Sequence, residues 1–196
     1  MDVWNKIDTQ FLSKRGLTQP DDYLQKVAAM GAVPSAKYTK ELFNLDMSEE
    51  EIIAEWFAMA KIAYAKEIQA KPGAIRFVRY LKSLGYQLAV ATSGSEELFL
   101  PTLKRLQIDT CFDYFVTSAM VGVSKNQPDI YLQCAKQMNL NPSECLVFED
   151  ILSAVRSAAS REFYTVAIYE PHNAKEQQEI QKTSHLYIHS FEEILS

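Results

Sequence analysis

Two adjacent carboxylates, Glu149 and Asp150, directly follow the apolar run from Cys145 to Phe148. Four apolar residues in a row predict a strand that is buried on both faces, as in a parallel sheet. Ligands bind to open α/β sheets beyond the carboxyl ends of the strands, and carboxylate oxygens suit Mg²⁺. The pair therefore indicates a magnesium site. The alternative is that the two acids cap a helix beginning near Ile151, where the helix dipole favours negative charge.

Two further strand ends carry residues that suit a phosphate. Thr92, Ser93 and Gly94 follow the apolar run 88–91 and precede a predicted helix, whose first N–H groups can hold an anion. The alternative is that Ser95 simply caps that helix. Lys125 lies beyond the predicted strand 114–117, and its ammonium either neutralises phosphate charge or is only solvated. Together the three strand ends indicate one crevice that holds an anion, a cation and a metal.

A parallel sheet is needed to bring these three strand ends together. The chain from residue 74 alternates between helical and strand patterns, which indicates right-handed βαβ crossovers and a doubly wound, Rossmann-like parallel sheet. The predicted helices are 74–84, 96–106, 128–138, 152–159 and 175–182, and the predicted strands are 87–91, 114–117, 145–148, 163–168 and 186–188.

The first third of the chain has only helical patterns. Val3, Ile7 and Phe11 recur at intervals of four, and Ser48 with Glu51 forms a capping box before a helix with a wide apolar surface. Weaker helical patterns cover 21–30 and 35–43. The pattern changes at the sequence Lys-Pro-Gly of residues 71–73, so we expect a helical domain over 1–69 and an α/β core domain over 70–196.

Composition excludes several classes of protein. The 196 residues are 47% hydrophobic, with 20 basic and 25 acidic side chains and a net charge of −5. The basic residues are scattered, so no nucleic-acid partner is indicated. The three cysteines show no CxxC spacing, and there is neither a leader pattern nor an apolar run long enough for a membrane span. We expect a cytoplasmic protein with reduced thiols, either a monomer or a homodimer.

These residues also resemble a known family. Thr92-Ser93-Gly94, then Lys125 with Pro128-Asp129, then Phe148-Glu149-Asp150 resemble the second, third and fourth motifs of the haloacid dehalogenase superfamily, in its β-phosphoglucomutase-like phosphatase branch. The helical stretch 1–69 resembles the cap of that branch. The resemblance implies that Thr92 holds the transferring phosphoryl group, that Lys125 bridges it to the nucleophile, and that Glu149 and Asp150 carry Mg²⁺.

The chain departs from the family at its first motif. Family members begin with a strand that ends in Asp-x-Asp, whose first Asp accepts the phosphoryl group, and residues 1–196 contain no such motif. In the family this strand lies mid-sheet, between the strands ending at Thr92 and Glu149. We expect two edges facing a gap, filled by an upstream segment, by another chain, or closed by direct pairing of the two edges. We favour a polypeptide that starts upstream, of which this chain is a shortened version.

The resemblance implies a phosphatase that hydrolyses a small phosphorylated metabolite through Mg²⁺-assisted phosphoryl transfer. Without the nucleophilic Asp we expect the chain as given to be inactive. The alternatives are a non-catalytic module that binds phosphate and metal, and a phosphosugar mutase. Four basic residues of the helical domain are candidates for substrate contacts: Lys14, Arg15, Lys26 and Lys37.

Overall fold

The computed structural model describes residues 2–28, 30–123 and 125–195. Contacts within the chain divide it into two compact units, Met1–Ile68 and Gln69–Ser196. No helix in the described ranges is both long and apolar enough to cross a bilayer.

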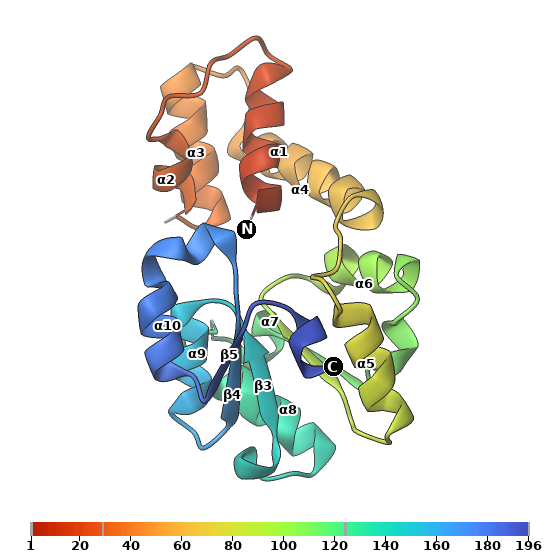
Figure 1. Ribbon diagram of the computed structural model, residues 1–196. Helices are drawn as coiled ribbons and strands as arrows, with labels where there is room; N and C mark the ends of the chain where they lie inside the picture. The colour runs from red at the N-terminus through yellow and green to blue at the C-terminus, as the bar shows by residue number, and fades with distance from the viewer. Residues whose placement is uncertain (1, 29, 124, 196) are drawn as a thin grey trace. The chain divides into compact units, whose positions relative to one another are not determined.

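The first unit is a helical bundle, as its sequence predicts (Figure 1). Its helices are α1 (Asp2–Ser13), α2 (Tyr23–Ala28), α3 (Ala32–Phe43) and α4 (Glu49–Lys66). The predicted capping box is confirmed, because Ser48 Oγ accepts from Glu51 N while the Glu51 carboxylate accepts from Ser48 N. Phe11 meets Trp56 edge-on with ring centroids 5.6 Å apart, which packs α1 against α4.

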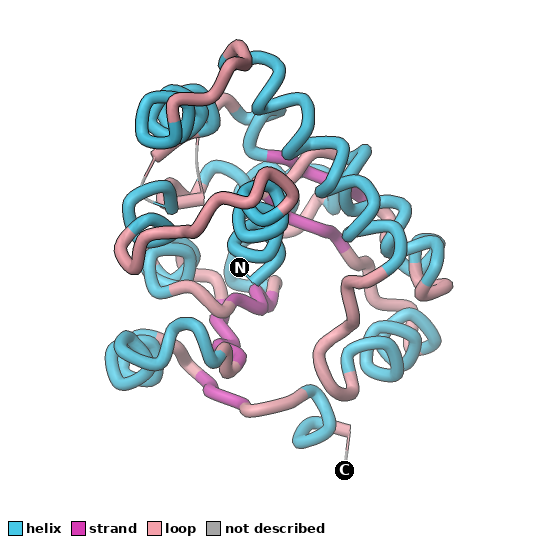
Figure 2. Tube along the Cα trace, turned by 90° about the horizontal axis from the view of Figure 1, so that it is seen from above, coloured by secondary structure: helices cyan, strands magenta, loops and turns pink. Residues whose placement is uncertain are grey.

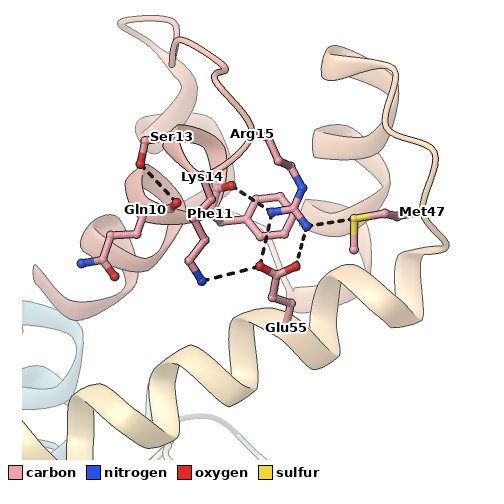
Figure 3. A network of polar contacts seen from close by, with 7 residues as sticks. All are labelled: Gln10, Phe11, Ser13, Lys14, Arg15, Met47 and Glu55. Carbon is pink, nitrogen blue, oxygen red and sulfur yellow. Dashed lines mark hydrogen bonds and ion pairs between the residues drawn. The ribbon is translucent and has the colours of Figure 1, made fainter.

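A second polar network fixes the start of the loop after α1, as Figure 3 shows. Arg15 donates to both carboxylate oxygens of Glu55, at 3.3 and 2.5 Å, and to the carbonyl of Phe11 at 3.0 Å. Lys14 Nζ lies 3.8 Å from the same carboxylate. The Arg15 hydrogen bond holds the pKa of Glu55 below its usual value, although partial burial acts in the opposite direction.

The second unit alternates helices and parallel strands, and the predicted α/β class is confirmed. Its helices are α5 (Ala74–Ser83), α6 (Glu96–Arg105), α7 (Ser118–Val121), α8 (Asp129–Met138), α9 (Leu152–Ala159) and α10 (Gln177–Thr183). Its strands are β1 (Ala89–Thr92), β2 (Tyr114–Thr117), β3 (Leu146–Glu149), β4 (Tyr164–Ile168) and β5 (Leu186–Ile188). The short helix α7 was not predicted, because four residues are too few to show a helical period.

The strands form two sheets rather than one, with the orders β1-β2 and β3-β4-β5. Helices nevertheless pack on the strands of both sheets, and Figure 2 shows the strands lying among helices. On one face α8 packs on β1 and β2, and α9 packs on β4. On the other face Phe77 of α5 meets Phe148 of β3, and Phe99 of α6 stacks on Phe115 of β2. The unit is therefore doubly wound, as predicted, but its sheet is broken between β1 and β3.

The break excludes one of the three arrangements expected for this region. Direct pairing of the two edges is wrong for this structure, since no ladder joins β1 to β3 in the described part of the chain. A cavity of about 850 Å³ lies between them instead, lined by Ala89 and Ala91 of β1 and by all four residues of β3. The expected gap is thus present.

The break between β1 and β3 predicts faster hydrogen exchange for the backbone amides that face it. The carbonyls of Leu88 and Cys145 accept from the neighbouring strands β2 and β4, so by alternation the N–H groups of Ala91 and Phe148 point to the break. We expect these two amides to exchange at least about tenfold faster than those of Val90 and Val147, which bond to β2 and β4. Residue-resolved hydrogen exchange by NMR measures this, and equal protection of all four amides would contradict the broken sheet.

The Arg15–Glu55 ion pair predicts how the free energy of unfolding depends on pH in the acidic range. Because the pKa of Glu55 is lowered on folding, its contribution is present above the pKa of the unfolded state and is lost as pH falls through the folded value. We expect Glu55→Gln to lower the free energy of unfolding by about 1 kcal/mol at pH 7, with a smaller difference from wild type at pH 3. Urea unfolding at both pH values measures the change. Glu41→Gln, on the exposed surface of α3, is the control.

Candidate functional site

The centre of the candidate site is the carboxylate of Glu149, the last residue of β3. This side chain is 7% exposed and forms an ion pair with Lys125. Its Oε1 also accepts a hydrogen bond of 2.8 Å from the hydroxyl of Tyr131, on α8. A buried carboxylate is tolerated only when it is paired and hydrogen-bonded, and here both partners are present.

Tyr131 is held in its neutral form by this arrangement. Burial raises the pKa of its hydroxyl well above the usual value, and the negative charge of Glu149 raises it further. The proton therefore stays on Tyr131 as a donor to Glu149 across the ordinary pH range. Helix α8 thereby connects the sheet on which it packs, β1-β2, to the end of β3.

Asp150 belongs to a different cluster from Glu149. Its Oδ2 lies 3.4 Å from Lys71 Nζ, and the same ammonium lies 2.6 Å from Glu170 and donates to the carbonyl of Tyr169 at 3.2 Å. The carbonyl of Asp150 accepts a 2.6 Å hydrogen bond from the buried amide of Asn173. Adjacent acids thus point to two different cations, Lys125 and Lys71.

The position of Lys71 is fixed by close packing of its segment. Gly73 has φ +78°, and a Cβ there would lie 2.7 Å from the backbone nitrogen of Glu192, so only glycine fits. Burial raises the pKa of Glu170, but the hydrogen bond and charge of Lys71 outweigh it and leave the pKa below its usual value. Glu170 is therefore ionised and shares the charge of Lys71 with Asp150.

The loop after β1 orients the hydroxyl of Thr92. Thr92 Oγ1 accepts a 3.0 Å hydrogen bond from Gly94 N, which leaves its own proton available as a donor. Ser93 Oγ lies 3.2 Å from the Oγ of Ser118, which follows β2, so the carboxyl ends of β1 and β2 meet. Ser95 is the N-cap of α6 but makes no side-chain cap hydrogen bond.

The structure thus brings some of the predicted residues together and not others. Lys125 and Glu149 are in contact, whereas Asp150 contacts Lys71, and no hydrogen bond joins Thr92 to Lys125 among the described residues. The N-cap residue of α9 is Ile151 rather than either acid, and it makes no side-chain cap hydrogen bond.

Sequence reasoning missed three partners: Tyr131, Lys71 and Glu170. Lys71 and Glu170 are 99 positions apart, so no spacing in the sequence could have connected them. Tyr131 lies on the apolar face of a predicted helix, where an aromatic residue is expected as core.

Asp150 fits Mg²⁺ better than Glu149 does. The side chain of Asp150 is 31% exposed, while the Glu149 carboxylate is buried and already paired with Lys125 and Tyr131. The described residues contain no cluster of three or more side chains able to hold a metal ion. Protein sites for Mg²⁺ often use one or two carboxylates and take the other ligands from water and substrate phosphate, so the donor set is compatible with the ion.

Three of the four basic candidates in the helical unit have acidic partners. Arg15 and Lys14 pair with Glu55, and Lys26 lies 2.7 Å from Asp22 one turn away. A substrate that used these cations would have to compete with carboxylates already in place.

The buried pair predicts a strong effect of charge removal. Lys125→Met leaves the Glu149 carboxylate without its cation, and we expect the free energy of unfolding to fall by roughly 3 kcal/mol. Adding Glu149→Gln to this variant removes the unpaired charge and should recover a large part of the loss. Urea unfolding of both single variants and the double variant measures the coupling.

Lys136→Met is the matched control, because Lys136 is exposed near the end of α8. It should change stability by less than about 0.5 kcal/mol. If Lys125→Met were equally mild, the ion pair would not be what compensates the buried carboxylate.

The chain is similar in sequence to two known proteins described as phosphatases. The chain is 31% identical over 180 residues to a probable pseudouridine-5'-phosphatase of Drosophila melanogaster, covering 89% of this chain and 75% of that protein. It is 29% identical over 177 residues to hexitol phosphatase A of Escherichia coli strain K12, covering 89% and 78%.

Among solved structures, a putative beta-phosphoglucomutase from Thermotoga maritima shares the fold with a TM-score of 0.84. The match covers 99% of this chain and 89% of that one, at 22% identity. Residues 2–160 match the family model of haloacid dehalogenase-like hydrolases. With this match, the α/β fold and the phosphatase relatives, the chain belongs to the haloacid dehalogenase-like hydrolase family.

Proposed function

We propose that this chain provides the phosphate-binding and Mg²⁺-binding side chains of a phosphatase that acts on a small phosphorylated metabolite. The observation that carries the proposal is the pairing of Lys125 with buried Glu149 at the carboxyl end of β3, in a family whose matched members here are phosphatases. The ion pair fixes an ammonium at the sheet end where α/β proteins bind ligands.

Three groups of this chain have distinct roles in the proposal. Lys125 neutralises charge on the phosphoryl oxygens, and Glu149 with Tyr131 holds Lys125 in position. The hydroxyl of Thr92 donates to a phosphoryl oxygen, because its acceptor side is already used by Gly94.

Asp150 would hold Mg²⁺, with Lys71 and Glu170 keeping its carboxylate in place. When bound, the metal would polarise the phosphoryl group and offset its developing charge. The cytoplasm remains the proposed compartment, and the chain is proposed to act as a monomer or a homodimer.

A non-catalytic binding module is the second candidate, and one observation favours it. Residues 1–196 contain no Asp-x-Asp sequence, and the resemblance assigns the phosphoryl acceptor to that motif.

A phosphosugar mutase differs from a phosphatase only in where the phosphoryl group goes. Product identification by ³¹P NMR with a hexose monophosphate separates the two, since a mutase forms an isomeric sugar phosphate and a phosphatase releases inorganic phosphate.

Hydrolysis of p-nitrophenyl phosphate tests the phosphatase directly. We expect the 196-residue chain to be inactive, and a polypeptide extended in frame upstream of Met1, carrying Asp-x-Asp, to be active only with Mg²⁺. Calorimetric titration of the 196-residue chain with inorganic phosphate and Mg²⁺ distinguishes the second candidate. Binding without activity in either polypeptide would favour the module, and neither binding nor activity would overturn both.

Asp150→Asn tests the metal site separately from folding. We expect it to reduce Mg²⁺-dependent activity of the extended polypeptide at least 100-fold, in line with loss of a metal ligand. Its melting temperature should stay close to that of the unchanged protein, because Asp150 is partly exposed. Asp109→Asn, in the same unit, is the control and should leave both properties unchanged. A large loss of stability in Asp150→Asn would assign the residue a structural role instead.

A further inference from the structure

Asp150 belongs to a charge cluster that is built from three separate segments of the core unit. Lys71 precedes α5, Asp150 follows β3, and Glu170 follows β4. The ammonium of Lys71 lies 2.6 Å from a Glu170 oxygen but 3.4 Å from Asp150 Oδ2. It also donates to the carbonyl of Tyr169 at 3.2 Å. One lysine thus serves two carboxylates, and its contact with Asp150 is the longest of the three.

Hydrogen bonds hold the backbone close to each member of the cluster. Phe191 N donates to the carbonyl of Pro72 at 3.1 Å, one residue after the lysine. The buried amide of Asn173 donates to the carbonyl of Asp150 at 2.6 Å, and Asn173 lies three residues after Glu170. The distances within the cluster therefore follow from how the three segments pack.

The charges of the cluster nearly balance. Two carboxylates and one ammonium leave a net charge of −1. His172 Nε2 lies 4.0 Å from the second oxygen of Glu170, which is too far for a hydrogen bond, so Lys71 is the closer cation. Charges a few ångströms apart interact appreciably even near a protein surface. A divalent cation on Asp150 would therefore be repelled by Lys71 and attracted by Glu170.

We propose, on the basis of the metal-binding role proposed above for Asp150, that Lys71 and Glu170 are positioning residues that set the affinity of Asp150 for a divalent cation. Lys71 is the protein's own cation beside Asp150 and opposes the metal. Glu170 holds that ammonium by the shorter contact and offsets its charge. Because the contact between Lys71 and Asp150 is the longest, it can open while those with Glu170 and Tyr169 remain.

Lys71 also has a role in the protein without metal. Two carboxylates that share a site repel each other unless a cation lies beside them. Lys71 supplies that cation from the chain itself, so the core unit can fold without an added ion. The same ammonium that stabilises the metal-free protein therefore weakens the binding of metal.

Four versions of the 196-residue chain test this charge balance: the unchanged chain, Lys71→Met, Glu170→Gln and the double variant. The net charges of their clusters are −1, −2, 0 and −1. Mn²⁺ is the probe, since carboxylate and water ligands suit it as they suit Mg²⁺, and its EPR signal measures the free ion.

The expected order of affinity follows the net charge of the cluster. At low ionic strength we expect Lys71→Met to bind Mn²⁺ at least about tenfold more tightly than the unchanged chain, and Glu170→Gln at least about tenfold more weakly. The double variant should return to within about threefold of the unchanged chain, because its cluster has the same net charge.

Two matched controls remove charges that are paired elsewhere in the same unit. Lys82→Met breaks the pair with Asp113, and Glu179→Gln breaks the pair with Arg156. Neither should change the affinity for Mn²⁺ by more than about twofold. Melting temperature is a second measurement. Without added metal, Lys71→Met should melt below the unchanged chain, and Mg²⁺ should raise its melting temperature by more.

Asp150→Asn separates the charge balance from the metal site itself. If this variant bound Mn²⁺ as tightly as the unchanged chain, or if no version bound it at millimolar concentration, the metal-binding role of Asp150 would fail and the charge balance with it. If Asp150→Asn lost binding but Lys71→Met and Glu170→Gln matched the unchanged chain, only the charge balance would fail.

Weaker binding by Lys71→Met would also overturn the charge balance, because it would show that the lysine only holds Asp150 in place. Circular dichroism verifies that each variant is folded. If Lys71→Met does not fold, Lys71→Gln makes the same change of charge and carries the same expectation.

Discussion

The carboxylate of Glu149 is the constraint on which the core unit depends. It lies buried at the end of a strand where apolar burial stops, and inside the protein it is paired with Lys125 and hydrogen-bonded by Tyr131. These two partners come from the segments that follow β2, so the pair connects β3 with the sheet β1-β2 although the strands themselves do not meet. Leaving this buried carboxylate unpaired would lower the free energy of unfolding by several kcal/mol. The ion pair and the hydrogen bond therefore favour the observed positions of Lys125 and of the start of α8.

Two neighbouring acids have different surroundings, and this separates their roles. The buried carboxylate of Glu149 is already paired with Lys125 and hydrogen-bonded by Tyr131 of α8. Asp150 is partly exposed and shares Lys71 with Glu170. One acid thus positions a cation, while the other keeps oxygen atoms accessible. Neutral hydroxyls at the ends of β1 and β2, those of Thr92, Ser93 and Ser118, complete the polar rim. If the carboxylates of Glu149 and Asp150 shared one cluster, they would repel each other and compete for one lysine.

The helix layers explain how the core unit tolerates a broken sheet. Helix α8 packs on β1 and β2 and hydrogen-bonds to the end of β3, and on the other face the aromatic rings of Phe77, Phe148 and Phe191 form a cluster. Side-chain packing therefore crosses the break on both faces, while backbone hydrogen bonds stop at it. The edges of β1 and β3 that face the break are unpaired in the described part of the chain, and among the residues of these two strands only Glu149 is buried.

The sequence alone determined the helical first unit, the alternation of helices and strands, and the residues at three strand ends, because periodicity and capping act over a few neighbouring positions. Ser48 with Glu51, and the strands 114–117 and 186–188, lie where their local patterns predict. Only the tertiary structure decided that Lys125 pairs with Glu149, that Asp150 turns to Lys71, and that the edges of β1 and β3 stay apart. These outcomes depend on residues tens of positions apart, whose meeting is set by how sheets and helices pack. No pattern within one segment contains that information, and the partners Tyr131 and Glu170 became visible only once the chain was folded.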